Sequence, residues 1–303
     1  MTELSVPAEP IPFRVLLDDA MKLTRLHFGK MYLPVAIPMA VLSALLIFVQ
    51  SRWVTGVMSG GDPTAFWTGP GCVAFAVTLL GILVMSFLTY GLLMAAGVDG
   101  STGKPIDMAA KWSFLFSPGV LGTLFVAFLL VVVGFCFFFF PGLFIALRLS
   151  FIIPVMAVEG LRGGAALKRS WSLVAYNPQK RWLSNTITKI FVLYLVAGVI
   201  GGLAAAIINI PFTAMQGFSA ARQISSGGTV DPQALVDSMR WLRVPQQILA
   251  SLVETAVRIY SSFGVVLLYL DVVRRKEGTD LATAIASRFG AGTQPPPPTT
   301  SPA

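Results

Sequence analysis

Long apolar runs with few charged residues alternate with short polar stretches along this chain. The clearest run lies between Lys30 and Arg52 and reads MYLPVAIPMAVLSALLIFVQS, 21 residues without a charge. About 20 apolar residues suffice for a helix to cross the hydrocarbon core of a bilayer. The pattern predicts an all-α, polytopic integral membrane protein with six transmembrane helices. We expect these six spans at residues 31–51, 72–98, 120–140, 143–158, 190–212 and 245–270.

Three further segments have helical periodicity, with an apolar face beside lysine and arginine side chains. Such amphipathic helices are built to lie in the membrane interface. The apolar faces are formed by Phe13, Leu16 and Phe28, by Leu167, Trp171 and Val174, and by Leu281, Ile285 and Phe289. The expected organisation is a disordered segment 1–11, an interfacial helix 12–30, a six-span domain 31–271, a cytoplasmic helix 272–290 and a disordered Pro-rich tail 291–303.

The third and fourth apolar runs are separated only by the sequence FCFFFFPG, residues 135–142. Proline followed by glycine favours a turn. The sequence therefore predicts a tight apolar hairpin between these two spans, with its phenylalanines packed against lipid or neighbouring helices.

The composition agrees with a membrane protein and not with a soluble one. Hydrophobic residues make up 55% of the chain and charged residues only 12%, whereas soluble domains carry about 25% charged residues. The net charge of +8 would suggest nucleic acid as the partner of a soluble chain, but here the cations flank apolar runs. The two cysteines, Cys72 and Cys136, lack metal-ligand spacing. A disulfide between them is geometrically possible, and two isolated buried thiols are the preferred interpretation.

The distribution of lysine and arginine predicts the orientation. If the amino terminus is inside, fifteen cations lie in inner segments and four lie in outer segments. Inner loops of membrane proteins are enriched in lysine and arginine. We therefore expect a multi-pass protein of the bacterial inner membrane with both termini in the cytoplasm. The four outer cations are Arg52, Arg222, Arg240 and Arg243.

Three charged residues fall inside the predicted spans. Arg148 lies near the middle of the fourth span, and Arg258 lies near the middle of the sixth, one helical turn after Glu254. A charge at the bilayer centre costs about 2.5–3.5 kcal/mol on insertion scales, so we expect the three side chains to meet. Such a cluster is either an ion pair that clamps the two spans together or a site for an anionic ligand.

A basic loop follows the fourth span. Its cations are Arg162, Lys168, Arg169, Lys180 and Arg181. Orientation in the membrane is enough to explain them. The alternative is that they bind anionic lipid headgroups, because a cation near an anionic surface contributes about 1 kcal/mol.

The segment ALRLSFIIPVMAVEG, followed by GAALKRSWSLV, resembles part of a known family. It is similar to the membrane domain of some bacterial glycerophosphodiester phosphodiesterases and to related six-span inner-membrane proteins without the enzyme. The similarity covers about residues 140–175. It implies an all-helical membrane protein without an agreed activity. The catalytic half of those enzymes is a soluble barrel that uses histidines, carboxylates and a metal, and this chain has one histidine.

No cofactor, metal site or nucleic-acid motif is predicted, and no serine elbow, HExxH or CxxC is present. The expected function is therefore that of a scaffold or accessory protein, without catalytic activity, that binds membrane lipids, a protein partner or a second copy of itself. The alternative is a small permease or lipid-handling carrier that uses Arg148, Glu254 and Arg258. A lipid-acting membrane enzyme is a third hypothesis, which lacks the clustered nucleophile and base that it would need.

Overall fold

The computed structural model describes residues 11–59, 70–176, 185–225 and 232–289. Helices dominate this part of the chain, and no strand occurs in it. The helices are α1 (Phe13–Ser59), α2 (Pro70–Ser101), α3 (Met108–Leu115), α4 (Pro118–Phe137), α5 (Phe139–Arg148), α6 (Ile152–Glu159), α7 (Gly163–Val174), α8 (Thr186–Ser225) and α9 (Pro232–Phe289).

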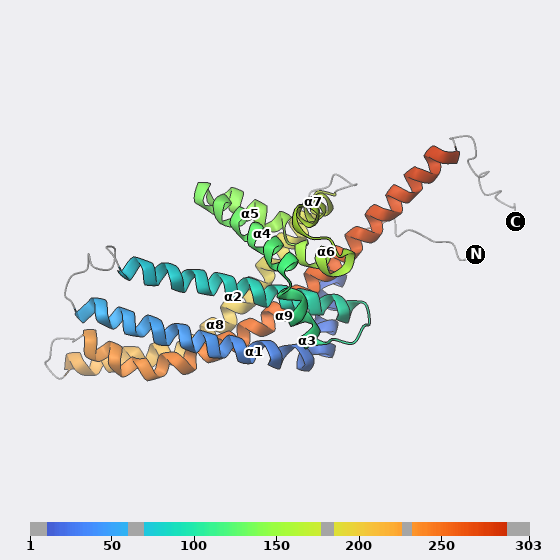
Figure 1. Ribbon diagram of the computed structural model, residues 1–303. Coiled ribbons are helices and arrows are strands. Elements are labelled where there is room, and N and C mark those ends of the chain that lie inside the picture. Colours follow the sequence, from blue (N-terminus) through green and yellow to red (C-terminus); the bar gives the residue numbers. More distant parts are fainter. Residues whose placement is uncertain (1–10, 60–69, 177–184, 226–231, 290–303) are drawn as a thin grey trace, which may run out of the picture.

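Four long helices, α1, α2, α8 and α9, run side by side and form the main bundle (Figure 1). Helix α9 is the centre of the bundle, since it packs against α1, α2 and α8. The shortest of the four, α2, has 32 residues and is about 48 Å long at 1.5 Å per residue. All four therefore exceed the thickness of the hydrocarbon core, about 30 Å.

Five helical segments in the described residues are long and apolar enough to cross a membrane. They coincide with the first and the third to sixth expected spans, so the membrane character of the chain is confirmed. The second expected span, 72–98, lies in the continuous helix α2. Most side chains of α2 before Ser86 lie outside the described part, so a count of six stays a prediction. The five segments are Phe13–Leu45, Pro118–Phe137, Phe139–Glu159, Thr186–Met215 and Val244–Gly278.

The separate interfacial helix expected at 12–30 is wrong, because α1 continues without a break to Ser59. Leu16 and Ala20 on its apolar face are buried and belong to a helix that packs along α9. The face that was assigned to lipid is therefore used inside the protein. The expected helix 272–290 is likewise the end of the single helix α9. Both α1 and α9 therefore run without interruption from the amphipathic segment into the apolar span beside it.

The segment 214–244, between the last two expected spans, is mostly helical. Helix α8 continues to Ser225, and α9 begins at Pro232. Proline suits the first turn of a helix because the missing N–H has no partner there in any case. The terminal segments 1–10 and 290–303 lie outside the described residues, so the disorder expected there stays a prediction.

The apolar hairpin between the third and fourth spans is present as α4 and α5, which meet at Phe138. The two helices touch through glycines: a β-carbon added to Gly142 would lie 2.7 Å from the backbone nitrogen of Phe135, and one added to Gly134 would lie 2.9 Å from the α-carbon of Gly142. Four phenylalanines at the tip are strongly exposed, as expected for a surface that faces lipid. They are Phe137, Phe138, Phe139 and Phe140.

The fourth span is not one helix. Helix α5 ends at Arg148, three residues form a turn, and α6 begins at Ile152. Helix α7 packs against α4, α5, α6 and α9, so it lies beside the break. Arg148 is therefore level with the basic helix α7 and does not lie at the middle of a straight membrane helix.

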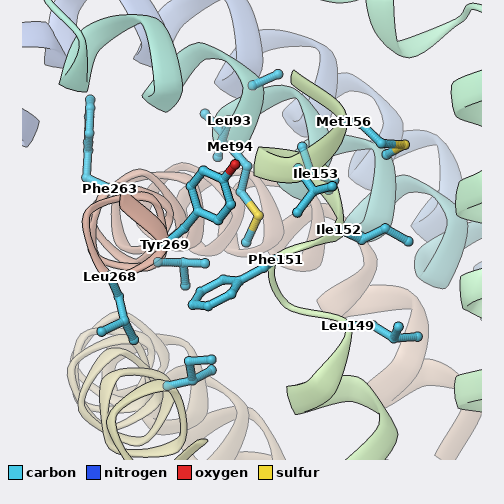
Figure 2. Packing of buried hydrophobic residues seen from close by; sticks show 14 of the residues in the cluster. Leu93, Met94, Leu149, Phe151, Ile152, Ile153, Met156, Phe263, Leu268 and Tyr269 are labelled. Carbon is cyan, nitrogen blue, oxygen red and sulfur yellow. The ribbon is translucent and has the colours of Figure 1, made fainter. Parts of the chain in front are cut away.

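The buried core lies where α2, α6 and α9 meet (Figure 2). The ring of Phe151 contacts the ring of Tyr269 edge to face, with 5.7 Å between the centroids. Phe263 of α9 and Leu93 of α2 belong to the same core and are fully buried. Apolar side chains continue onto the outer surface of the bundle in rows four residues apart. One row on α1 is Leu33, Ile37, Val41 and Leu45, and one on α8 is Leu195, Val199, Leu203 and Ile207.

The close approach of α4 and α5 gives a first prediction. We expect Gly142→Ala to lower the stability of the protein by about 1–3 kcal/mol, because the new methyl group overlaps the backbone of Phe135. The measurement is thermal unfolding of the purified protein in detergent.

The matched control is Gly198→Ala on α8, where an added β-carbon meets no atom within 4 Å. Alanine favours a helix over glycine by about 0.5–1 kcal/mol, so this change should be neutral or stabilising. Equal behaviour of the two variants would contradict the glycine contact between α4 and α5.

Candidate functional site: an apolar cavity beside an intramembrane ion pair

A cavity of about 840 Å³ lies between the α4–α5 hairpin and the main bundle. This is the size of pockets that enclose small organic ligands, about 300–1,000 Å³. Its wall is almost entirely apolar. The cavity exists because the hairpin packs mainly on itself and on α7, and touches the bundle only lightly through α5 and α8. Its lining comes from α2 (residues 86–94), α4 (127–136), the α5–α6 segment (143–153) and Tyr194 of α8.

The few polar groups in the wall are hydroxyls that already have partners. Tyr90 and Ser261 share a hydrogen bond of 2.5 Å, and the rings of Tyr90 and Tyr194 meet edge to face at 6.1 Å. Ser86 Oγ accepts a hydrogen bond from Arg258 Nη2 at 3.1 Å. Hence the side chains that could orient a polar ligand are bonded to one another.

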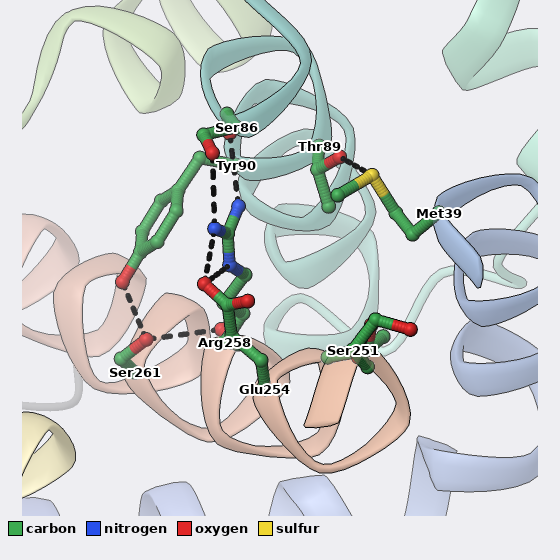
Figure 3. Close-up of polar contacts among 9 residues, drawn as sticks. Met39, Ser86, Thr89, Tyr90, Ser251, Glu254, Arg258 and Ser261 are labelled. Carbon is green, nitrogen blue, oxygen red and sulfur yellow. Dashed lines mark hydrogen bonds and ion pairs between the residues drawn. The ribbon is translucent and has the colours of Figure 1, made fainter. Parts of the chain in front are cut away.

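Behind this wall lies the ion pair between Arg258 and Glu254 (Figure 3). Arg258 Nη2 and Glu254 Oε1 are 2.5 Å apart, and the two residues lie one helical turn apart on α9. Arg258 also donates to the carbonyl oxygen of Ser86 at 3.3 Å and lies over the ring of Tyr90, 5.9 Å from its centroid. The pair is therefore neutral, lies within α9 and ties α9 to α2, so these two residues do not form the expected clamp between the fourth and sixth spans.

Arg148 does not join this pair, so the expected cluster of three charges is wrong. Its guanidinium lies against the rings of Phe144 and Trp171, 4.9 and 5.2 Å from their centroids, and the two rings meet edge to face. Its Nη1 donates a long hydrogen bond, 3.4 Å, to the carbonyl oxygen of Trp171. In the part of the chain that the structure describes, no carboxylate lies within ion-pair distance of Arg148. The break after α5 turns this side chain toward α7 and away from α9.

One of the basic residues predicted after the fourth span, Arg169, belongs to a network that joins α6, α7 and α9. Its Nε donates to both carboxylate oxygens of Glu159, at 2.8 and 3.1 Å, and its Nη2 donates to Glu277 at 3.0 Å. Tyr269 donates to Glu159 at 3.0 Å. Partial burial alone would lower the pKa of Arg169, but the hydrogen bond and charge of Glu159 outweigh it and raise this pKa. Arg169 thus fastens α7 to α6 and α9.

The other basic residues are placed differently. Arg162 and Lys168 are exposed at the surface around α7, while Lys180 and Arg181 lie outside the described residues. The apolar stripe predicted on α7 is only partly right, since Val174 is buried with Ala166, Ser170 and Leu173 in the protein core, and Trp171 is 42% exposed. The side chains of the third stripe, Leu281, Ile285 and Phe289, are outside the described part.

Sequence reasoning missed the cavity and the residues around it. A signal was present: Ser86, Tyr90 and Ser261 are hydroxyl side chains within apolar runs, where each needs a partner inside the protein. Cys136 lines the cavity as a free, exposed thiol. The side chain of Cys72 is not among those described, so their pairing is untested. No group of three His, Cys, Asp or Glu side chains that could hold a metal comes together in residues 11–59, 70–176, 185–225 and 232–289.

Comparisons with models of known protein families, with curated proteins and with solved structures give no match. The resemblance to the membrane domain of the phosphodiesterases therefore stays a prediction. The function has to be inferred from the cavity and the charged groups alone.

The separation of Arg148 from the ion pair gives a second prediction, a double-mutant cycle. We expect Glu254→Gln and Arg258→Gln to couple by about 0.5–3 kcal/mol, because each removes the partner of the other. Glu254→Gln and Arg148→Gln should add without coupling. The measurement is the free energy of unfolding of each single and double variant in detergent. If the coupling energy between Glu254 and Arg148 equals the coupling energy between Glu254 and Arg258, the hypothesis of a three-charge cluster is supported again.

Proposed function

We propose that this protein is a bacterial inner-membrane protein without catalytic activity that binds a lipid acyl chain in the cavity between the α4–α5 hairpin and the bundle. The observation that carries the proposal is the cavity itself, about 840 Å³ with an apolar wall. An acyl chain is the apolar ligand that surrounds a membrane protein at the highest concentration. In this role the chain is an accessory protein or scaffold whose binding partner is lipid.

The lining argues against a small polar substrate. A permease for such a substrate needs unsatisfied polar groups along a wet path, because a polar group that loses water without gaining a hydrogen bond is costly. Here the lining hydroxyls of Ser86, Tyr90 and Ser150 bind neighbouring groups of the protein. An acyl chain needs none of these groups and gains from contact with the apolar lining.

The alternative, a lipid-handling carrier, has one observation in its favour. Glu254 is more than half exposed although it belongs to a membrane-spanning segment. An exposed carboxylate near the middle of a span favours local access of water, which a headgroup crossing the membrane would need. Transfer of a fluorescent lipid between the leaflets of vesicles separates the two proposals, since an accessory lipid-binding protein does not accelerate it.

The orientation that we propose, with both termini in the cytoplasm, is supported by the excess of lysine and arginine in one set of segments. These segments hold α7 and the inner network around Glu159 and Arg169. The opposite set holds the ends of α8 and α9 near Ser225 and Pro232.

A third prediction tests the cavity directly. We expect Ala146→Phe to reduce the amount of added lipid that the delipidated protein binds, because Ala146 lines the cavity and a phenyl ring would fill part of it. The measurement is native mass spectrometry after delipidation and addition of a photoactivatable fatty acyl lipid, with the labelled peptides identified.

The matched control is Ala206→Phe on the exposed surface of α8, which should bind as the unchanged protein does. Labelled peptides should come from α2 and from the α4–α5 hairpin. Equal labelling of both variants, or labelling spread over the outer surface only, would refute the proposed cavity function.

A fourth prediction concerns orientation and uses a chain from which Cys72 and Cys136 have been removed. A cysteine in place of Ser225 should react with a membrane-impermeant maleimide in intact cells, and one in place of Ala165 should react only after the cells are opened. Both positions are exposed in the structure, whereas Ser170 is fully buried and serves as the unreactive control. The reverse labelling pattern would invert the proposed topology.

A further inference from the structure

An uncompensated arginine lies on a face of α5 that does not line the cavity. Arg148 follows Phe140 and Phe144 at intervals of four residues, so the three side chains form one row along the helix. Phe140 is 78% exposed and Phe144 is 43% exposed. The cavity is instead lined by Leu143, Ala146 and Leu147. The row is therefore a separate surface, apolar at the hairpin tip and cationic beside α7.

The guanidinium is held against a pair of aromatic rings. Phe144 and Trp171 meet edge to face with 6.0 Å between their centroids, and the guanidinium contacts both rings at distances typical of cation–π contacts. Hydrogen bonds also join the end of α5 to α7. Ser170 Oγ donates to the carbonyl oxygen of Arg148 at 2.9 Å, and Arg148 Nη1 donates to the carbonyl oxygen of Trp171. An arginine held in this way is preorganised and loses little freedom on binding a ligand.

The charge of Arg148 calls for an anion that this part of the chain does not supply. The nearest carboxylate in sequence, Glu159, is bound to Arg169 and Tyr269. No ion pair to Arg148 occurs among the described residues, and its buried Nε has no hydrogen-bond partner. Lys168 lies one turn before Trp171 on the exposed face of α7 and adds a second cation to the same surface.

We propose that Phe140, Phe144, Arg148, Lys168 and Trp171 form a binding site for one anionic phospholipid. Its phosphate would accept hydrogen bonds from Arg148 and Lys168, and an acyl chain would lie along Phe144 and Phe140. Arginine matches phosphate well because its planar fork presents several N–H groups. A lipid is favoured over a soluble anion because the row continues from the arginine to the strongly exposed hairpin tip. The site goes beyond the proposed cavity function and is independent of it.

The test compares phosphatidylglycerol with phosphatidylcholine of the same acyl chains, each titrated onto the delipidated full chain in detergent and counted by native mass spectrometry. The unchanged protein should prefer phosphatidylglycerol. Arg148→Gln should reduce that preference about fivefold, and Lys168→Gln should reduce it by a smaller factor. Arg25→Gln removes an exposed cation from α1 and should leave the preference unchanged.

Three results would overturn the site. The first is an unchanged preference in Lys168→Gln together with an unchanged preference in Arg148→Gln or, if that variant does not fold, an unchanged preference in Lys168→Glu, which reverses the charge of the exposed second cation. The second is an equal loss in Arg25→Gln, which would reduce the effect to net charge. The third is displacement of the lipid by inorganic phosphate at equal concentration, which would indicate a soluble anion site. Ala146→Phe separates the two proposals: it should lower cavity occupancy and keep the preference for phosphatidylglycerol.

Discussion

The scarcity of hydrogen-bond partners in hydrocarbon constrains every part of this structure. A polar group within the membrane must find its partner inside the protein, and the hydroxyl side chains do so over short distances. Thr24, Thr255 and Ser262 each donate to the carbonyl oxygen four residues earlier on their own helix. Arg258 needs more, and takes a carboxylate from its own helix and two oxygens from α2. The contact between α9 and α2 therefore includes a polar group, Arg258, whose hydrogen bonds lipid cannot supply.

The sequence was sufficient to predict an all-helical membrane protein, because apolar length and the absence of charge determine which segments can enter a bilayer. It was also sufficient for the hairpin, where proline and glycine follow a row of phenylalanines. The sequence was not sufficient to predict where the long helices begin and end. The segments 12–30 and 272–290 have the amphipathic pattern of interfacial helices, yet they continue α1 and α9. Periodicity states which face is apolar and leaves open whether lipid or a neighbouring helix covers it.

The charged residues were predictable one by one and not as a group. Arg258 and Glu254 are one turn apart on one helix, so spacing alone brings them together. Arg148 was placed with them on the assumption that the fourth span is straight. The turn at residues 149–151 removes that assumption and redirects the side chain to Trp171. The cavity leaves only a weak signal in the sequence, the hydroxyl side chains within apolar runs, because its wall is assembled from four separate helical segments.

Helix α9 has a mechanical consequence for the two sides of the membrane. Its 58 residues form one helix of about 87 Å, which reaches from the end of the bundle near Pro232 to beyond the network around Glu159 and Arg169. A rod of this length, tilted by about 5°, displaces its far end by about 8 Å, given the rise per residue. No loop interrupts α9 to absorb such a movement. A change in bilayer thickness or lateral pressure that tilts one end is therefore transmitted to the other, and the two membrane surfaces of this protein are coupled through a single element.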